Sequence, residues 1–385
     1  MNLACAILMR FTRSGSSFVT FIGFVVLLGP AAAQGTVQSK KHSFKVETVA
    51  DGLRNPWGME MLPDGRFLVT ERPGRLRIIG ADGKLQDAPV ANVPDVVARG
   101  QGGLLDVRLH PNYAQNGWIY LSFSKPLPGG SLTSIIRVRL KGNALADIET
   151  VFEPPADEAT NTALHFGNRI EFDGKGHMFF SIGERGEQEN AQKLEYVKGK
   201  VHRLHDDGRV PADNPFAKQS GARPSIWSYG NRNVQGLRFQ PGTDRLWATE
   251  HGPRGGDELN LIRKGANYGW PVITFGINYS GSKISDITAK AGMEQPVQQW
   301  TPSPAFCGMD FYRGDKFPQW KGSLFMSALA LQKVIRVAIN GEKVTDEEVL
   351  LERTGRIRDV RCFADGFVYV IYDEPGKIVR LVPAG

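Results

Sequence analysis

The sequence predicts an all-β fold, and more narrowly a six-bladed β-propeller with four-stranded antiparallel blades. Glycine (44 residues) and proline (23 residues) are frequent in the 385-residue chain, which favours many turns over long helices. One unit, a glycine-bearing turn followed by two short apolar strands, returns six times. A single unit cannot bury both faces of its sheet, so successive units are expected to pack as blades around a channel. A large β-sandwich is the alternative, but the regular return of one unit is more typical of a propeller.

The six copies follow one another at irregular intervals, because the loops between them differ in length. Each copy joins its two strands through a short polar connection, as in a β-hairpin. The copies begin at Leu62, Asn116, Phe172, Pro241, Lys321 and Ala364. Helical periodicity is weak and is confined to residues 157–164 and 289–295.

The first 33 residues are predicted to be a secretory signal peptide. Arg10 and Arg13 precede an apolar run over residues 18–28, and three alanines at 31–33 end the segment. A charged region, a short apolar run and a small-residue cleavage site are typical of such a peptide. The run is short for a stable membrane span, and a retained N-terminal anchor is the alternative. We therefore expect cleavage near Ala33, one propeller domain over residues 34–385, and a periplasmic or secreted protein.

Charge and cysteine content argue against several classes of protein. The formal charge is +7, and loss of the two arginines in residues 1–33 lowers it to +5. No clustered basic face accompanies this modest surplus, so nucleic-acid binding is not expected. Cys307 and Cys362 remain after cleavage. They either form one disulfide in an oxidising compartment or stay as two separate buried thiols.

Five loops are unusually rich in polar residues, and a propeller carries its function on such loops at one mouth of the channel. They recur at comparable places in successive units, so their side chains are expected to converge. One of them, SYGNRNVQGLRF at 228–239, groups Arg232, Asn233 and Gln235, which are donors suited to electron-rich oxygens. A plain polar turn is the alternative there. The five loops are residues 97–113, 160–172, 228–239, 249–271 and 353–363.

Long strings in these loops and in the first unit resemble the soluble pyrroloquinoline quinone (PQQ)-dependent aldose dehydrogenases of the glucose/sorbosone dehydrogenase family. The strings are LRNPWGMEMLPDGRFLVTERPGRL, GQGGLLDVRLHP, GNRNVQGL, TEHGPRGGDELNLIRKGANYGWP and RIRDV, in family order. The likeness is greater to periplasmic bacterial aldose sugar dehydrogenases than to the narrower soluble glucose enzyme. It implies a six-bladed propeller that oxidises an aldose at the anomeric carbon to a lactone, with PQQ and Ca²⁺ as cofactors and a separate electron acceptor. A calcium-dependent propeller lactonase and a non-catalytic ligand-binding propeller are the alternatives.

The resemblance also implies roles for individual residues. His165, in ALHFGNRI, matches the family's general base, for which an unperturbed pKa of ~6.5 is suitable; a structural histidine is the alternative. The glucose-enzyme branch has an acidic residue before this histidine, and here Leu164 stands there. We therefore expect a backbone or water contact to orient His165.

Other matches concern the cofactor. Arg232 and Asn233 are expected to face a quinone oxygen, and Gln235 to support the loop or contact the sugar. Arg356 and Arg358 are expected to bind the cofactor's carboxylates from one side of a strand, unless that strand face is simply solvated. The remaining implied cofactor contacts are Gln101, Tyr279 and Thr301.

Two calcium sites are implied in the same way. The backbone carbonyls of Gly252 and Pro253 are expected to hold one ion beside the quinone, and Glu258 with the Tyr268 backbone oxygen a second. Taken alone, GGDELNLI is also compatible with plain surface acids.

One position departs from the family. Ala330 aligns with a lysine that lies near the quinone in relatives, and Lys333 is close by. This predicts weaker cofactor binding than in lysine-bearing relatives, unless Lys333 takes that place.

Overall fold

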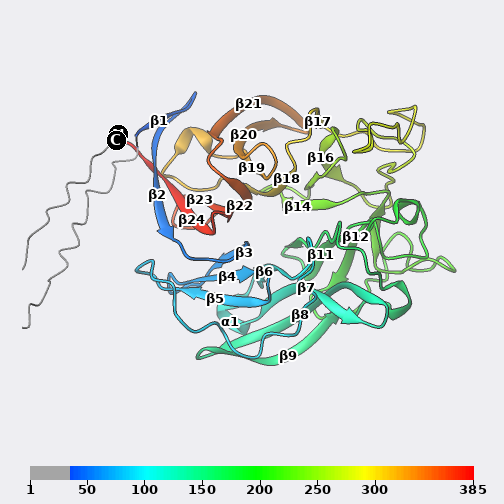
Figure 1. The fold of residues 1–385 in the computed structure, drawn as a ribbon, viewed down its shortest axis with the longest axis horizontal. Coiled ribbons are helices and arrows are strands. Elements are labelled where there is room, and N and C mark those ends of the chain that lie inside the picture. The colour runs from blue at the N-terminus through cyan, green and yellow to red at the C-terminus, as the bar shows by residue number, and fades with distance from the viewer. Residues whose placement is uncertain (1–34) are drawn as a thin grey trace, which may run out of the picture. The chain divides into compact units, whose positions relative to one another are not determined.

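The protein is built from six antiparallel β-sheets arranged around a common centre (Figure 1). This computed structural model describes residues 35–385, which form one compact unit. The expected signal peptide and its cleavage near Ala33 lie outside the described residues. The chain passes from sheet to sheet around the ring, so the predicted six-bladed propeller is confirmed.

Each blade begins with its innermost strand, and each further strand outward pairs antiparallel with the one before it. The first has three strands: β3 (Pro56–Met61), β4 (Phe67–Glu71) and β5 (Arg75–Ile79). The second has β6 (Leu104–Leu109), β7 (Ile119–Leu127), β8 (Gly130–Lys141) and β9 (Ala144–Phe152). The third has β10 (Ile170–Phe172), β11 (His177–Ile182), β12 (Lys200–His205) and β13 (Ile226–Tyr229).

The remaining three blades follow the same plan. The fourth has β14 (Val234–Phe239), β15 (Leu246–Glu250), β16 (Asp257–Ile262) and β17 (Gln298–Trp300). The fifth has β18 (Phe306–Phe311), β19 (Leu324–Ala328), β20 (Lys333–Asn340) and β21 (Lys343–Glu352). The sixth has β22 (Arg356–Cys362), β23 (Val368–Glu374), β24 (Lys377–Pro383), β2 (Ser43–Ala50) and β1 (Val37–Gln38).

The sixth blade closes the ring, because it combines strands from two distant parts of the chain. β2 pairs antiparallel with β24, with Phe44 opposite Pro383 and Thr48 opposite Val379. The backbone hydrogen bonds between β2 and β24 therefore join the region before the first blade to the end of the last one.

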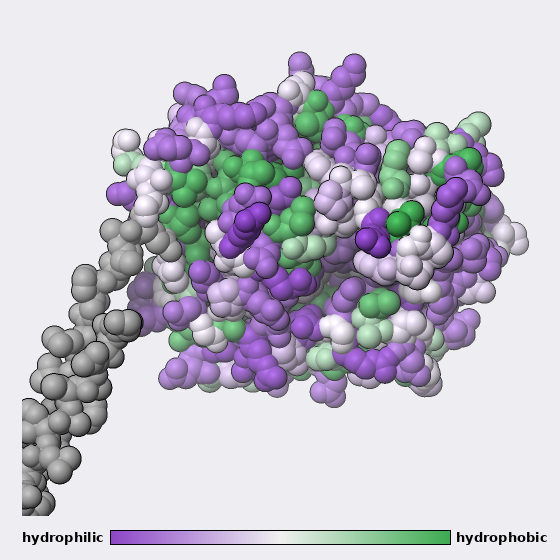
Figure 2. Space-filling view, turned by 45° about the horizontal axis from the view of Figure 1, so that its top comes forward, coloured by the Kyte–Doolittle hydropathy of each residue, from purple (hydrophilic) through white to green (hydrophobic). Residues whose placement is uncertain are grey.

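Helices are short in the described residues. They are α1 (Tyr113–Asn116) and the 3₁₀ turns η1 (Ala156–Glu158), η2 (Gln188–Gln192) and η3 (Pro318–Trp320). The weak helical periodicity therefore gives one 3₁₀ turn at the start of 157–164 and only turns at 289–295, where Gly292 adopts a positive φ of 81°. No helix within residues 35–385 is long and apolar enough to cross a membrane. Figure 2 shows mainly hydrophilic side chains on the face that it draws, with an apolar patch in its left half.

The hydrophobic core lies between neighbouring blades. Trp247 and Leu259 of the fourth blade, for example, pack against Phe306, Met309 and Phe311 of the fifth. Because the apolar face of each sheet packs against the next, the blades stabilise one another in sequence around the ring.

The channel is crossed near the C-terminal ends of the innermost strands by a closed ring of six charged side chains, one from each innermost strand. Their signs alternate, so each arginine lies between two carboxylates. Arg108 lies 2.7 Å from both Glu60 and Glu171, and Arg238 lies 3.2 Å from Glu171 and 3.4 Å from Asp310. Arg361 completes the ring by pairing with Asp310 at 4.0 Å and with Glu60. We call these six residues the ion ring.

Removing one member of the ion ring should destabilise the fold strongly. Arg361 is 1% exposed, so Arg361→Met leaves Glu60 and Asp310 without one of their buried partners. We expect a loss of about 3–5 kcal/mol in the free energy of unfolding. The matched control, Arg380→Met, breaks the exposed pair with Glu47 in the same blade and should cost less than about 1 kcal/mol. Urea unfolding of both variants measures the difference, and equal losses would contradict the role of the ion ring.

Candidate active site

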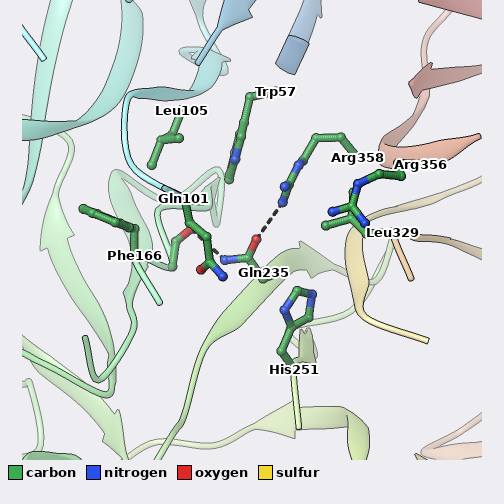
Figure 3. A pocket seen from close by; sticks show the side chains of 10 residues that line it. Trp57, Gln101, Leu105, Phe166, Gln235, His251, Leu329, Arg356 and Arg358 are labelled. Atoms are coloured by element: carbon green, nitrogen blue, oxygen red, sulfur yellow. Dashed lines mark hydrogen bonds between the residues drawn. The ribbon is translucent and has the colours of Figure 1, made fainter. Parts of the chain in front are cut away.

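A cavity lies on the propeller axis at the mouth where the innermost strands begin. Its walls come from the innermost strands of four blades, from the loops before β6 and β10, and from the turns after β15 and β19 (Figure 3). Arg356, Arg358 and Leu329 lie on one side, with Gln101 and Phe166 opposite them. The lining residues are Trp57, Gln101, Leu105, Phe166, Gly167, Gln235, His251, Leu329, Arg356 and Arg358.

The floor of the cavity is formed by Trp57, Gln235 and Arg358. Polar contacts hold these side chains in place. Arg358 Nη1 donates to Gln235 Oε1 at 3.1 Å, and Gln235 Nε2 donates to Asn233 Oδ1 at 3.1 Å. Bulges interrupt the pairing of β3, β6, β14, β18 and β22 with their neighbours. A bulge re-aims the side chains around it, and here these side chains include the floor residues.

His165 lies beside this cavity on a strained loop. It has φ 52°, and Asn168 on the same loop has φ 78°, so both adopt the left-handed region that non-glycine residues rarely occupy. The surrounding structure must fix such residues, and they gather at functional sites. Gln101 Oε1 accepts a hydrogen bond from the His165 backbone N–H at 2.8 Å, which helps to fix this loop.

A carboxylate orients the His165 ring. Nδ1 contacts Glu184 Oε1, and Glu184 is 1% exposed. The expectation of a backbone or water contact was therefore wrong. The carboxylate thus comes from Glu184 and not from the position before His165, where Leu164 is 46% exposed. No residue within the described chain is hydrogen-bonded to Nε2, which leaves this nitrogen for a ligand.

Burial determines the charge of His165. It lowers the pKa of His165 below the ordinary value, and nearby Arg232 lowers it too, while the Glu184 carboxylate opposes both effects. The ring is therefore neutral near pH 7 and available as a base.

Arg232 lies on the other side of His251, in a second pocket. Its Nη1 donates to the backbone oxygens of His251 at 3.1 Å and Gly252 at 3.0 Å. Its backbone N–H contacts the Glu250 carboxylate. The second pocket is lined by Arg232, Glu250, His251, Gly252, Gly256, Glu258, Tyr268, Trp270, Ile273 and Thr274.

Two carboxylates in this second pocket, Glu250 buried and Glu258 half-buried, suit a cation. Asn260 Nδ2 lies 3.4 Å from Glu250 Oε2 and 3.0 Å from Glu258 Oε2, so one amide bridges the pair. Burial, with the Glu250 charge nearby, raises the pKa of Glu258 to about 8. The amide oxygens of Asn231 and Asn260 are buried and have no hydrogen-bond partner in the part of the chain that the structure describes. Carboxylate and amide oxygens are ligands that Ca²⁺ prefers, so this donor set fits calcium.

Unpartnered donors around the first cavity suit an electron-rich ligand. Asn233 Nδ2 and Arg358 Nε are buried and have no hydrogen-bond partner among the described residues. Asn233 touches the lining through Gly167 and Gln235. A planar ligand with carbonyl and carboxylate oxygens would satisfy these donors, so the residues present fit PQQ.

Several residues singled out in the sequence lie away from the first cavity. Thr301 supports the adjoining loop by accepting the Gly256 N–H at 3.1 Å. Tyr279 is 74% exposed. Leu329 lines the cavity. Ala330, the next residue, is exposed in a turn, and Lys333 is half-buried at the start of β20. Ala330 and Lys333 do not line the cavity, and weaker cofactor binding than in lysine-bearing relatives stays a prediction.

Cys307 and Cys362 are free thiols, so the alternative of separate thiols holds. Cys307 Sγ lies 3.4 Å from His251 Nε2 and 3.5 Å from Arg358 Nη1, next to the cavity floor. Burial raises the pKa of Cys307 to about 11, so the thiol is neutral.

Among the residues that were given no role from the sequence, four bear directly on the site. Trp57 and His251 line the cavity and lie within strings quoted for the family likeness. Glu250 is the last residue of β15 and lines the second pocket, and Glu184 lies two residues after β11 and contacts His165. The only signal for these two acids was their place at or just after the end of a strand, near glycines.

The chain belongs to the glucose/sorbosone dehydrogenase family, whose model matches residues 53–380. Aldose sugar dehydrogenase YliI of Escherichia coli is 48% identical over 346 residues, which cover 88% of this chain and 92% of that protein. Quinoprotein glucose dehydrogenase B of Acinetobacter calcoaceticus is 30% identical over 441 residues, covering 91% and 90% of the two chains.

Solved structures agree with this assignment. The apo-form crystal structure of the soluble aldose sugar dehydrogenase of Escherichia coli superimposes with a TM-score of 0.84 at 46% identity, covering 88% of this chain and 99% of the other. The PQQ-bound aldose sugar dehydrogenase of Streptomyces coelicolor gives a TM-score of 0.73 at 30% identity, covering 89% and 99%.

The carboxylate pair predicts a calcium-dependent stability. Because the folded protein holds the Glu258 proton more tightly than the unfolded chain, the calcium-free protein should lose stability as pH rises from about 4.5 to about 8. Added Ca²⁺ should restore that stability, most strongly near pH 8. Glu258→Gln should remove both the loss and the calcium effect. Thermal unfolding across this pH range measures both, and an unchanged calcium response in Glu258→Gln would exclude this pair as the ligand.

Proposed function

We propose that this protein is a quinoprotein oxidoreductase that converts aldose sugars to lactones at the anomeric carbon, with His165 as the general base. The observation that carries this proposal is the His165–Glu184 pair beside a cavity with unpartnered donors. The family and the activities named for the similar proteins support it. PQQ, when bound, would supply an ortho-quinone that accepts a hydride from the sugar, which is one proton together with two electrons.

His165 takes the proton of the anomeric hydroxyl on Nε2 while the hydrogen on that carbon leaves with its electron pair. Its lowered pKa keeps Nε2 unprotonated and ready to accept. Glu184 holds Nδ1 and stabilises the imidazolium that forms, as the third member of a catalytic triad does. Gln101 fixes the backbone of the same loop.

The cofactor is held by the arginines and amides of the cavity. Arg356 and Arg358 offer paired N–H donors to carboxylates, while Gln101, Asn233 and Gln235 offer amide groups. Arg232 supplies positive charge where negative charge develops on a ligand oxygen, which is the main way that fixed donors accelerate such a step. Tyr279 and Thr301 belong to loops that adjoin this side of the site.

Calcium is proposed at two places. Glu258 and the Tyr268 backbone oxygen hold one ion in the second pocket, with Glu250 adding charge. The Gly252 and Pro253 carbonyls hold another beside the cavity. Gly252 oxygen already accepts from Arg232, and a carbonyl oxygen has a second lone pair for a metal.

A lactonase would need acidic side chains that converge on one central ion. The axial carboxylates Asp106 and Asp359 are paired with Arg169 instead. The dehydrogenase is therefore favoured. We further propose that the protein acts in the periplasm or outside the cell, with residues 1–33 removed as a signal peptide.

Reconstitution tests the proposal. The apoprotein with PQQ and Ca²⁺ should reduce an artificial electron acceptor with a range of aldoses, and should not use nicotinamide. His165→Gln should lose about 10²–10⁴-fold in kcat while its affinity for PQQ is kept. Absence of sugar oxidation at saturating PQQ and Ca²⁺ would refute the function, and near-normal turnover of His165→Gln would return that residue to a structural role.

Glu184 should set the pH dependence of the same reaction. Its carboxylate raises the pKa of His165, so Glu184→Gln should move the acid limb of kcat/KM to lower pH and lower the plateau by about 10²-fold or more. The pH–rate profiles of both forms give the comparison. Glu187→Gln is the control, because Glu187 pairs with Lys198. A lowered plateau with an unmoved acid limb would mean that Glu184 does not act on His165.

A further inference from the structure

One arginine spans the channel between the cavity and the ion ring. Arg169 is 1% exposed, and its Nη1 lies 3.2 Å from Asp106 Oδ1 and 3.0 Å from Asp359 Oδ2. Arg169, Asp106 and Asp359 each come two positions before a member of the ion ring. Asp106 and Asp359 also directly follow Leu105 and Arg358, which line the cavity. These three residues therefore form a layer between the ion ring and the cavity floor, which it supports.

The equivalent positions of the other three blades are glycines, and two of them leave room for the Asp106 and Asp359 carboxylates. The glycines are Gly58, Gly236 and Gly308, each two positions before a ring member. A Cβ on Gly58 would lie 2.9 Å from Asp106 Oδ1, and a Cβ on Gly308 would collide with the Asp359 carboxylate. This layer thus holds one arginine and two carboxylates, with no space for a fourth side chain.

Arg169 also contacts three residues that line the cavity above it. Its Nε donates to the backbone oxygen of Gln235 at 2.7 Å, and its Nη2 donates to that of Arg358 at 3.4 Å. Its guanidinium carbon lies 4.0 Å from the centroid of the Trp57 ring. All five N–H groups of a guanidinium lie in one plane, so a single side chain can fix two backbones and one ring together.

We infer that Arg169 is a positioning residue: from beneath the cavity it fixes Gln235, Arg358 and Trp57 in the arrangement that receives the cofactor. The inference rests on the proposed function for the identity of that ligand. A positive charge alone is not enough to position these residues, because the hydrogen bonds to the backbone oxygens of Gln235 and Arg358 require the planar guanidinium group. A lysine would keep the charge beside Asp106 and Asp359 but would lose those contacts.

The test compares Arg169→Lys with Arg238→Lys. Arg238 is equally buried and also lies between two carboxylates, but it belongs to the ion ring, and within residues 35–385 its side chain donates no hydrogen bond to a cavity-lining residue. Each variant is measured at the same interval below its own unfolding temperature. Titration with PQQ should give a Kd about tenfold or more higher for Arg169→Lys, and a nearly native Kd for Arg238→Lys.

A second readout needs no cofactor. Cys307 is fully buried at the floor, 3.5 Å from Arg358 Nη1, so a displaced floor should expose it. Iodoacetamide labelling of the apoprotein, mapped by mass spectrometry, should be about tenfold faster at Cys307 in Arg169→Lys, whereas Arg238→Lys should label Cys307 at the native rate. Equal effects of the two substitutions on both readouts would overturn the inference and leave Arg169 as a stabilising residue only.

Two further outcomes are distinguished by design. If Arg169→Lys does not fold, Gly308→Ala takes its place, because the added Cβ displaces Asp359 from Arg169 while Arg169 itself is kept. Its Cys307 labelling and PQQ affinity should change in the same direction, and native values for both would overturn the inference. If the native protein binds no PQQ, the proposed function fails, and the labelling comparison alone decides for or against the positioning role of Arg169.

Discussion

The structure depends on the pairing of charges inside its channel. Six innermost strands converge there, and each presents one charged side chain; five of these are buried and Arg108 is half-buried. Isolated buried charges cost several kcal/mol each, so the charges must neutralise one another. Alternating signs do this only around an even number of strands, and Glu60, Arg108, Glu171, Arg238, Asp310 and Arg361 alternate around six. The ion ring thus suits six blades in this order.

The same strands build the candidate active site above the ion ring. Trp57, Leu105, Gln235 and Arg358 each lie three positions before a ring member, and all four line the cavity. The bulges near these positions explain how a strand can direct both groups of side chains toward the axis. The cavity floor and the ion ring are therefore built on the same strands. His165 and Arg232 come from loops beside it and are fixed by Glu184 and Glu250.

Much of the fold could be predicted because its signal is local. Glycine turns and alternating apolar strands repeat along the chain, and six repeats are confirmed as six blades. The ion ring was also visible as GMEM, DVRL, RIEF, GLRF, GMDF and DVRC, but one charge between apolar neighbours looks the same on a solvated strand face. Only the closed ring shows that these charges are buried.

The site was predictable only where residue type and motif agreed. Gln101, Gln235, Arg356 and Arg358 line one cavity, and Gly252, Glu258 and Tyr268 line the next with Arg232. The partner of His165 could not be read from the sequence, because Glu184 is 19 positions away after another strand. The neighbouring position, Leu164, misled the prediction, since the carboxylate that orients the base is supplied through tertiary packing.

The central claim is that the axial cavity at the start of the innermost strands receives the quinone. A crystal structure of the protein with PQQ and Ca²⁺ tests it most directly. We expect density for the quinone above the floor formed by Trp57, Gln235 and Arg358. Its carboxylates should contact Arg356 and Arg358, and His165 Nε2 should face the space left for the sugar. Density for the quinone at the opposite mouth, or a cavity without the quinone at saturating concentration, would contradict it.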